Sequence, residues 1–219
     1  NPVTCSDPRC TGGGNTCLDC VVSAALPTND LVLRLETDTG LLSSAGTATG
    51  WLDSSGEGNH LTAFGGPAVT TAALNGRDIV SFDGVNDRLE RTDTLNGLPV
   101  GNSNRSVFQV VRYRSNGFGG VAYGSLLCNT AFGLVVDPLG KLAVQGWCTD
   151  FPTSVTGNGA GWLVQSAVLA SGGNFRHFRN GDLIGSGTHA FNTGGDRLVL
   201  GAELDRSPHI QMDVAAVLV

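Results

Sequence analysis

Residues 163–181 read LVQSAVLASGGNFRHFRNG, and this stretch indicates the fold of the chain. Residues 163–170 and 175–179 are short runs in which apolar side chains recur at alternate positions, which is the pattern of β-strands. Asn180-Gly181 follows, and both central residues of a type I′ hairpin turn need a positive φ, which Asn and Gly tolerate best. The stretch therefore predicts antiparallel strands joined by tight turns.

The rest of the chain repeats this pattern. Further strands are expected at residues 31–36, 78–82, 106–114, 120–128, 132–136, 141–148, 197–202 and 210–219. Asp83-Gly84, residues 137–140 and Gly194-Gly195 supply turn signals between them. The 32 glycines oppose long helices, because each costs about 1 kcal/mol in a helix relative to alanine. We expect an all-β fold, an antiparallel sandwich or barrel, and the length favours a jelly roll of two packed sheets.

Charge and hydropathy exclude several classes of partner. Charged residues make up only 15% of the chain, the net charge is -6, and no basic cluster is large. These features argue against nucleic acid and against an anionic membrane surface as partners. No run of about 18 apolar residues exists, so we expect no membrane span.

The cysteines divide the chain into two parts. Four of them lie in the first 20 residues, namely Cys5, Cys10, Cys17 and Cys20. We expect disulfides to staple this short N-terminal extension, residues 1–28, which is too small to build its own core. A zinc site formed by the same four cysteines is the alternative, because two of them form a CxxC pair. Residues 29–219 form the predicted jelly-roll domain.

Disulfides require an oxidising compartment, so we expect a secreted or cell-surface protein. No signal peptide precedes Asn1, which indicates a mature or trimmed chain. The sequence stops within the apolar run of residues 214–219, and we expect more chain to follow it in a larger multidomain protein.

Three segments carry a family resemblance: WLDSSGEGNH at residues 51–60, GGP at 65–67 and SFDGVNDRL at 81–89. Together they resemble the N-terminal third of laminin-G-like, concanavalin A-like jelly-roll domains of bacterial secreted proteins. Residues 178–181 and 212–219 resemble a hairpin and the closing strand of the same domains, so the resemblance covers residues 29–219. It implies a lectin, a carbohydrate-binding module, an adhesion domain or a glycan-cleaving enzyme, because this fold hosts all four.

The first segment also has an explanation that needs no ligand. Asp53 and Ser55 can accept hydrogen bonds from nearby backbone amides in a turn, Gly56 and Gly58 supply positive φ, and Trp51 is expected to pack inside. The resemblance further implies a structural calcium ion, which takes six to eight oxygen ligands from loops. Its candidate ligands are Asp83, Asn86 and Asp87, and a second acidic loop holds Asp53, Glu57 and Asn59.

The sequence contains no complete catalytic motif of this fold. The closest approach to the E-x-D-x-x-E strand of family 16 glucanases is Glu203-Leu204-Asp205, which lacks the third carboxylate and lies between Gly201 and Pro208 in an expected loop. Glycoside hydrolysis needs two suitably spaced carboxyl groups, which this pair could barely supply. We therefore predict no catalysis, with a polysaccharide lyase or hydrolase as an alternative.

A sugar site needs an aromatic face and planar polar groups. We expect Cys128 and Cys148 to pair across neighbouring strands, and alternation without a bulge would then place Trp147 and Tyr123 together on the opposite side. Trp147 shares its predicted face with Gln145, and Asp150 is close in sequence. This group is the main predicted site, and the alternative is that a loop of the same domain covers Trp147.

A second predicted site lies on the strand that follows residue 174. Phe175, His177 and Arg179 share one face of it, and an arginine can hold the carboxylate or sulfate of an acidic sugar with two hydrogen bonds. A surface strand with paired arginines is the alternative. The function that these patterns favour is binding of a polysaccharide or other glycan, and an adhesion domain that binds protein is the alternative.

Overall fold

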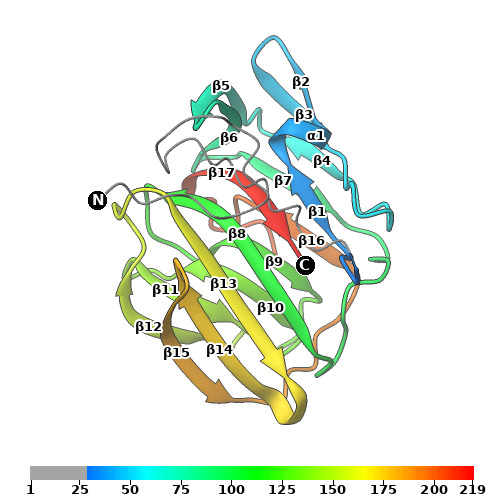
Figure 1. Ribbon diagram of the computed structural model, residues 1–219, viewed down its shortest axis with the longest axis vertical. Coiled ribbons are helices and arrows are strands. Elements are labelled where there is room, and N and C mark those ends of the chain that lie inside the picture. The colour runs from blue at the N-terminus through cyan, green and yellow to red at the C-terminus, as the bar shows by residue number, and fades with distance from the viewer. Residues whose placement is uncertain (1–28) are drawn as a thin grey trace, which may run out of the picture. The chain divides into compact units, whose positions relative to one another are not determined.

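The strands form two antiparallel layers that face each other (Figure 1). The computed structural model describes residues 29–219. In the first layer the hydrogen-bonded order is β15 (Asp182–Thr188), β14 (Asn174–Arg179), β13 (Leu163–Ala170), β8 (Arg105–Tyr113) and β17 (Gln211–Leu218). The far edge of β17 is shared by β1 (Arg34–Glu36) and β6 (Arg77–Asp83).

The second layer contains nine strands among the described residues. Their order is β12 (Phe151–Thr156), β11 (Lys141–Gln145), β10 (Ala131–Val136), β9 (Gly119–Gly124), β16 (Arg197–Leu200), β7 (Arg88–Arg91), β4 (Leu61–Phe64), β3 (Thr47–Trp51) and β2 (Leu41–Ser44). β5 (Ala68–Leu74) pairs with β6 and touches β3, so it links the two layers. A four-residue helix, α1 (Thr37–Gly40), follows β1, and no described helix could span a membrane.

The core fills the space between the layers. In β8 every second residue, from Arg105 to Tyr113, is buried, as expected for a strand with one face on a core. The largest fully buried side chains include Trp51, Phe82, Tyr113, Tyr123 and Phe132. The prediction of an all-β sandwich of two antiparallel sheets is confirmed.

The hairpin that the sequence predicted at Asn180-Gly181 is present. Arg179 of β14 is paired with Asp182 of β15, and the two residues between them have φ values of 52° and 88°. Both values are positive, as a type I′ turn requires. The turn therefore fixes the register of the first layer's outer hairpin.

All ten predicted strands exist, but several are shorter than expected, and the one expected at 31–36 begins only at Arg34. The strand expected at 120–128 ends at Gly124, and the one expected at 141–148 ends at Gln145. Seven further strands, β2–β5, β7, β12 and β15, were not predicted. Several of these are exposed and carry small or polar side chains without clear alternation, so their pairing comes from neighbouring strands and not from their own pattern.

The segment around Asp53 has the predicted internal explanation. The two oxygens of this carboxylate, which is 6% exposed, accept hydrogen bonds from the backbone amides of Arg34, Ser55 and Asn59 and from the Ser55 hydroxyl, all at 2.9 Å. Gly56 and Gly58 have positive φ, and Trp51 is fully buried. The Asp53 carboxylate therefore ties β1 to the loop after β3 without a ligand.

The four N-terminal cysteines, Cys5, Cys10, Cys17 and Cys20, lie outside the described residues, so their disulfides or zinc site stay a prediction. The described strands belong to one compact unit, residues 31–219. The expected start of the jelly-roll domain at residue 29 lies two residues before it.

We expect Asp53→Ala to lower the free energy of unfolding by about 3 kcal/mol, because it leaves several backbone amides without an acceptor and each loss costs about 1–3 kcal/mol when buried. Urea denaturation measures the change. Asp196→Ala is the matched control, since this exposed carboxylate bonds to no described residue, and its effect should stay within about 0.5 kcal/mol. Equal effects of the two substitutions would contradict this role of Asp53.

Candidate functional site

The candidate site lies on the outer face of the second layer. Side chains of β9, β10 and β16 that point away from the core are small: Ala122, Ala131 and Val199. They pack with Ala202 and Leu204, which belong to the loop after β16, in a cluster separate from the main core. The half-buried ring of Trp147 packs against this cluster.

The loop at residues 201–210 crosses this face and is held on both sides. At β11, Gln145 Nε2 donates a hydrogen bond to Glu203 Oε1 at 2.9 Å. At β7, Arg206 Nε donates to Glu90 Oε2 at 2.8 Å. Leu204 lies between these two attachments and is fully buried. The loop therefore covers part of the sheet and brings Glu203 to the strand that precedes Trp147.

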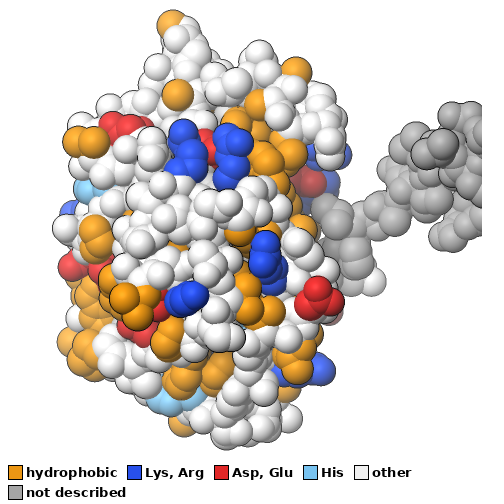
Figure 2. Space-filling view, turned by 90° about the vertical axis from the view of Figure 1, so that its left-hand side faces the viewer, with side chains coloured by type: hydrophobic (Ala, Val, Ile, Leu, Met, Phe, Trp, Pro, Cys, Tyr) orange, Lys and Arg blue, Asp and Glu red, His pale blue; other side chains and the backbone are white. Residues whose placement is uncertain are grey.

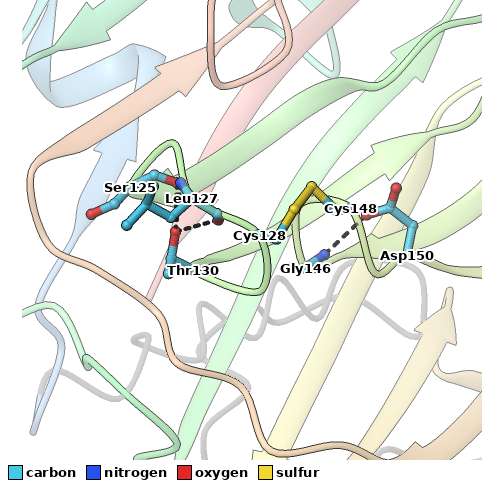
Figure 3. The surroundings of a disulfide bond; sticks show 7 residues. All are labelled: Ser125, Leu127, Cys128, Thr130, Gly146, Cys148 and Asp150. Atoms are coloured by element: carbon cyan, nitrogen blue, oxygen red, sulfur yellow. Dashed lines mark hydrogen bonds between the residues drawn. A yellow bond between two sulfur atoms is a disulfide. The ribbon is translucent and has the colours of Figure 1, made fainter.

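Trp147 is positioned by a disulfide. Trp147 and Cys148 both have positive φ, 62° and 60°, so the chain turns sharply after β11. Cys148 is bonded to Cys128, which confirms the predicted pair, and Figure 3 shows how this bond joins the two neighbouring loops. The backbone amide of Asn129 also donates to the Trp147 carbonyl at 2.7 Å. These contacts fix the loop that carries the indole.

Carboxyl groups surround this position. Burial, followed by the negative charges of Asp205 and Asp150, raises the pKa of Glu203 to about 7, although the bond from Gln145 opposes the shift. Burial also raises the pKa of Asp150, whose Oδ1 accepts a hydrogen bond from the Gly146 amide at 3.1 Å (Figure 3). Near neutral pH, Glu203 can therefore donate or accept a hydrogen bond.

Gln145 adds an unused acceptor to this group. Its side chain is fully buried, and its Oε1 has no hydrogen-bond partner among residues 29–219. A buried amide oxygen without a partner is costly, and because this oxygen is closed to solvent, Gln145 contributes to the site by holding Glu203. Trp147, Gln145, Asp150, Glu203 and Asp205 thus form what we call the Trp147 cluster.

The structure brings three predicted site residues together and leaves out the fourth. Trp147, Gln145 and Asp150 belong to the cluster, whereas Tyr123 faces the core and is 1% exposed. The Tyr123 hydroxyl accepts a hydrogen bond from Arg105 Nη1 and donates one to the Pro99 carbonyl, both at 2.9 Å. The prediction that Tyr123 shares a face with Trp147 is wrong, because β9 ends at Gly124 and alternation cannot be counted onward to Cys128.

The second predicted site is also placed differently. Phe175 and His177 face the core, and only Arg179, at the end of β14, is half-buried. His177 Nε2 lies 3.0 Å from Gln165 Nε2, and burial lowers the pKa of His177 to about 4. The interpretation of this face as a surface for acidic sugars is wrong, because alternation points it inward and turns Arg176 outward.

Two of the predicted calcium ligands, Asp83 and Asp87, accept hydrogen bonds from backbone amides. Asp83 Oδ1 accepts hydrogen bonds from the amides of Val85 and Asn86 at 2.7 and 3.3 Å, and Asp87 Oδ2 accepts one from the Asp83 amide at 2.9 Å. Within residues 29–219 no three His, Cys, Asp or Glu side chains form a group suited to a metal ion. Calcium at this loop stays a prediction.

Glu203 and Asp205 lie in a loop, as predicted. The return of this loop over the sheet was not predicted. One signal was available: Leu204 is apolar between two acidic residues, and an apolar side chain in a polar loop often packs onto the protein.

Comparisons with known proteins show the fold. No protein-family model and no curated protein matches this chain. Among solved structures, it is similar to domain 4 of AbnA, an extracellular GH43 arabinanase from Geobacillus stearothermophilus determined with arabinotriose, at 18% identity and a TM-score of 0.58. This match covers 86% of our chain and 91% of that domain.

Two longer proteins are also similar. The binding domain of Paraclostridial Mosquitocidal Protein 1 is 14% identical with a TM-score of 0.60, and the match covers 87% of our chain but 49% of that one. The sialidase of Trypanosoma rangeli is 13% identical with a TM-score of 0.62, over 89% of our chain and 31% of the sialidase. Our chain thus spans half or less of these two structures, and at such identities the likeness shows a shared β-sandwich.

The raised pKa of Glu203 predicts a pH-dependent stability. Because the folded-state value, about 7, exceeds the ordinary 4.5, the folded protein binds this proton more tightly and loses stability as pH rises from about 4.5 through 7. Glu203→Gln removes the titration. We therefore expect the variant to gain unfolding free energy relative to the wild type between pH 5 and pH 8, measured by urea denaturation. A difference between the two proteins that is the same at both pH values would contradict the shift.

Proposed function

We propose that this chain is a non-catalytic carbohydrate-binding module of a secreted protein and that it binds polysaccharide at the Trp147 cluster. One observation carries the proposal: the half-buried Trp147 packs on the outer sheet face against the cluster that holds Leu204, whose chain neighbours Glu203 and Asp205 bring carboxyl groups to this face. Sugar recognition uses an aromatic face for the C–H groups of the ring and planar polar groups for its hydroxyls. The Trp147 cluster offers both.

Two further findings support this proposal. The chain has the fold of domain 4 of AbnA, which was solved with arabinotriose, and that domain belongs to a larger extracellular enzyme. The Cys128–Cys148 disulfide fits an oxidising, extracellular location. A laminin-G-like module attached to a larger secreted protein accounts for both, and an adhesion domain that binds protein is the alternative if no glycan binds.

A glycan-cleaving enzyme is the second candidate, and the pKa of Glu203 is the observation that favours it. A carboxyl group whose pKa is raised to about 7 near other carboxyl groups is a feature of the general acid in glycoside hydrolysis. Release of reducing ends from a bound polysaccharide, abolished in Glu203→Gln, would establish catalysis. Binding without release supports the module.

The binding test uses arabinotriose and a panel of neutral polysaccharides, followed by calorimetry and tryptophan fluorescence. We expect a hit that changes the fluorescence of the wild type, and we expect Trp147→Ala to weaken affinity at least tenfold, because it removes the stacking surface. Trp162→Ala is the matched control, since Trp162 belongs to the loop before β13 in the other layer, and it should bind the same ligand as the wild type does.

Asp205→Asn provides a second variant, because Asp205 is exposed and asparagine keeps the acceptor for the Ser207 amide. We expect a several-fold loss of affinity with unchanged unfolding. If Trp147→Ala and Asp205→Asn both fold and bind like the wild type, the Trp147 cluster is not the binding site.

A further inference from the structure

The outer face of the first layer is lined along β13 by a regular pattern of side chains. Residues of β13 alternate between the core and the outer face of the sheet, so Val164, Ser166 and Val168 lie on the outer face, with Ser166 buried there. Phe108 of β8 and Phe178 of β14 are both in register with Ser166, one on each side. A row of smaller side chains on β13 is therefore flanked by two aromatic rings.

This face exposes apolar surface that the fold itself does not use. Phe108 and Val164 are each 40% exposed, and Leu183 of β15, which is in register with Phe178, is 57% exposed. Neighbouring exposed apolar side chains on one sheet face indicate a surface for a ligand or partner.

Arginines stand over the aromatic rings at both ends of the row. The Arg112 Cζ lies 5.3 Å from the ring centroid of Trp162, and the Arg176 Cζ lies 5.9 Å from that of Phe178. Stacking of this kind holds the guanidinium plane while leaving its N–H groups able to bind an anion.

The part of this face formed by β8, β13 and β14 carries more arginines than carboxylates, although the chain has a net charge of -6. Arg112 and Arg114 share one buried carboxylate, Asp213, at 2.6 and 2.8 Å, so one positive charge remains. Arg176 is exposed and forms no ion pair with any residue of 29–219. Figure 2 shows another side of the molecule, where Lys and Arg side chains lie close to acidic ones.

The spacing suits a chain molecule. Phe178 and Arg176 are in register with Ser166 and Val168, which lie four and six residues beyond Trp162, or about 13–20 Å along an extended strand. The two arginine–aromatic pairs are therefore too far apart for one monosaccharide. They are placed for an extended polymer whose negative charges recur along its length.

We propose that the outer face of β8, β13 and β14 binds an anionic polysaccharide, with Arg112, Arg114 and Arg176 on its carboxylate or sulfate groups and Trp162, Phe108 and Phe178 against its sugar rings. This site is independent of the Trp147 cluster, because it lies on the other layer. It would let one domain hold a neutral and an acidic glycan at the same time.

The test measures the binding of three polymers. Polygalacturonate carries only carboxylates, dextran sulfate carries only sulfates, and dextran is uncharged. We expect at least one anionic polymer to bind in a salt-sensitive way, and dextran not to bind on this face. The polymer that binds identifies the anion. Arg176→Ala and Trp162→Ala should each weaken this binding about tenfold.

Two controls decide the location. Lys141→Ala removes an equal charge from β11 in the other layer and should leave affinity for the anionic polymer nearly unchanged, as should Trp147→Ala. Unfolding midpoints confirm that Arg176→Ala, at an exposed position, remains folded. The proposal is overturned if neither anionic polymer binds, if Arg176→Ala weakens binding no more than Lys141→Ala, or if Trp147→Ala weakens it as much as Trp162→Ala.

Discussion

Strand alternation across two facing sheets is the constraint on which the rest of this structure depends. Each strand of the second layer that turns large apolar side chains toward the core must turn its other residues outward. In β9, β10 and β16 those residues are Ala122, Ala131 and Val199, which leave an apolar strip outside the core. Burying this strip requires a cover, and the loop at residues 201–210 supplies it through Leu204. The Trp147 cluster exists because that same loop carries Glu203 and Asp205.

Inside the sandwich, alternation produces an unusual feature, a chain of buried polar side chains. Gln109 Nε2 donates to Gln165 Oε1 at 2.9 Å, the Tyr113 hydroxyl donates to the same oxygen at 2.7 Å, and Gln165 Nε2 meets His177. Gln109 Nε2 also donates to the Leu134 carbonyl of the second layer at 3.0 Å. Polar groups in a core must find partners, so these bonds tie the two layers at a defined relative position. His177 belongs to this network and not to a sugar site.

The two outer faces of the domain differ in charge. Glu203, Asp150 and Asp205 gather near Trp147 on the second layer, whereas Arg112, Arg114 and Arg176 gather on the first. In the acidic group, burial and the neighbouring carboxylates raise the pKa of Glu203. The basic group holds its guanidinium planes over aromatic rings. The net charge of -6 thus conceals two chemically distinct surfaces, which suits a domain that meets more than one ligand.

The amino-acid sequence alone determined the strands with strong alternation, the Asn180-Gly181 turn and the Asp53 turn. It also determined the association of Trp147 with Gln145 and Asp150. These features depend on residues close together in the chain, where local periodicity and turn chemistry decide. The disulfide between Cys128 and Cys148, 20 residues apart, could be predicted because these are the two cysteines that lie beyond the N-terminal group. Tertiary structure decided the direction of Tyr123 and His177, because strand ends and layer positions determine which alternate face meets the core. It also decided that Glu203 bonds to Gln145, since a contact between residues 58 positions apart comes from a loop folding back over a sheet, which no local pattern encodes.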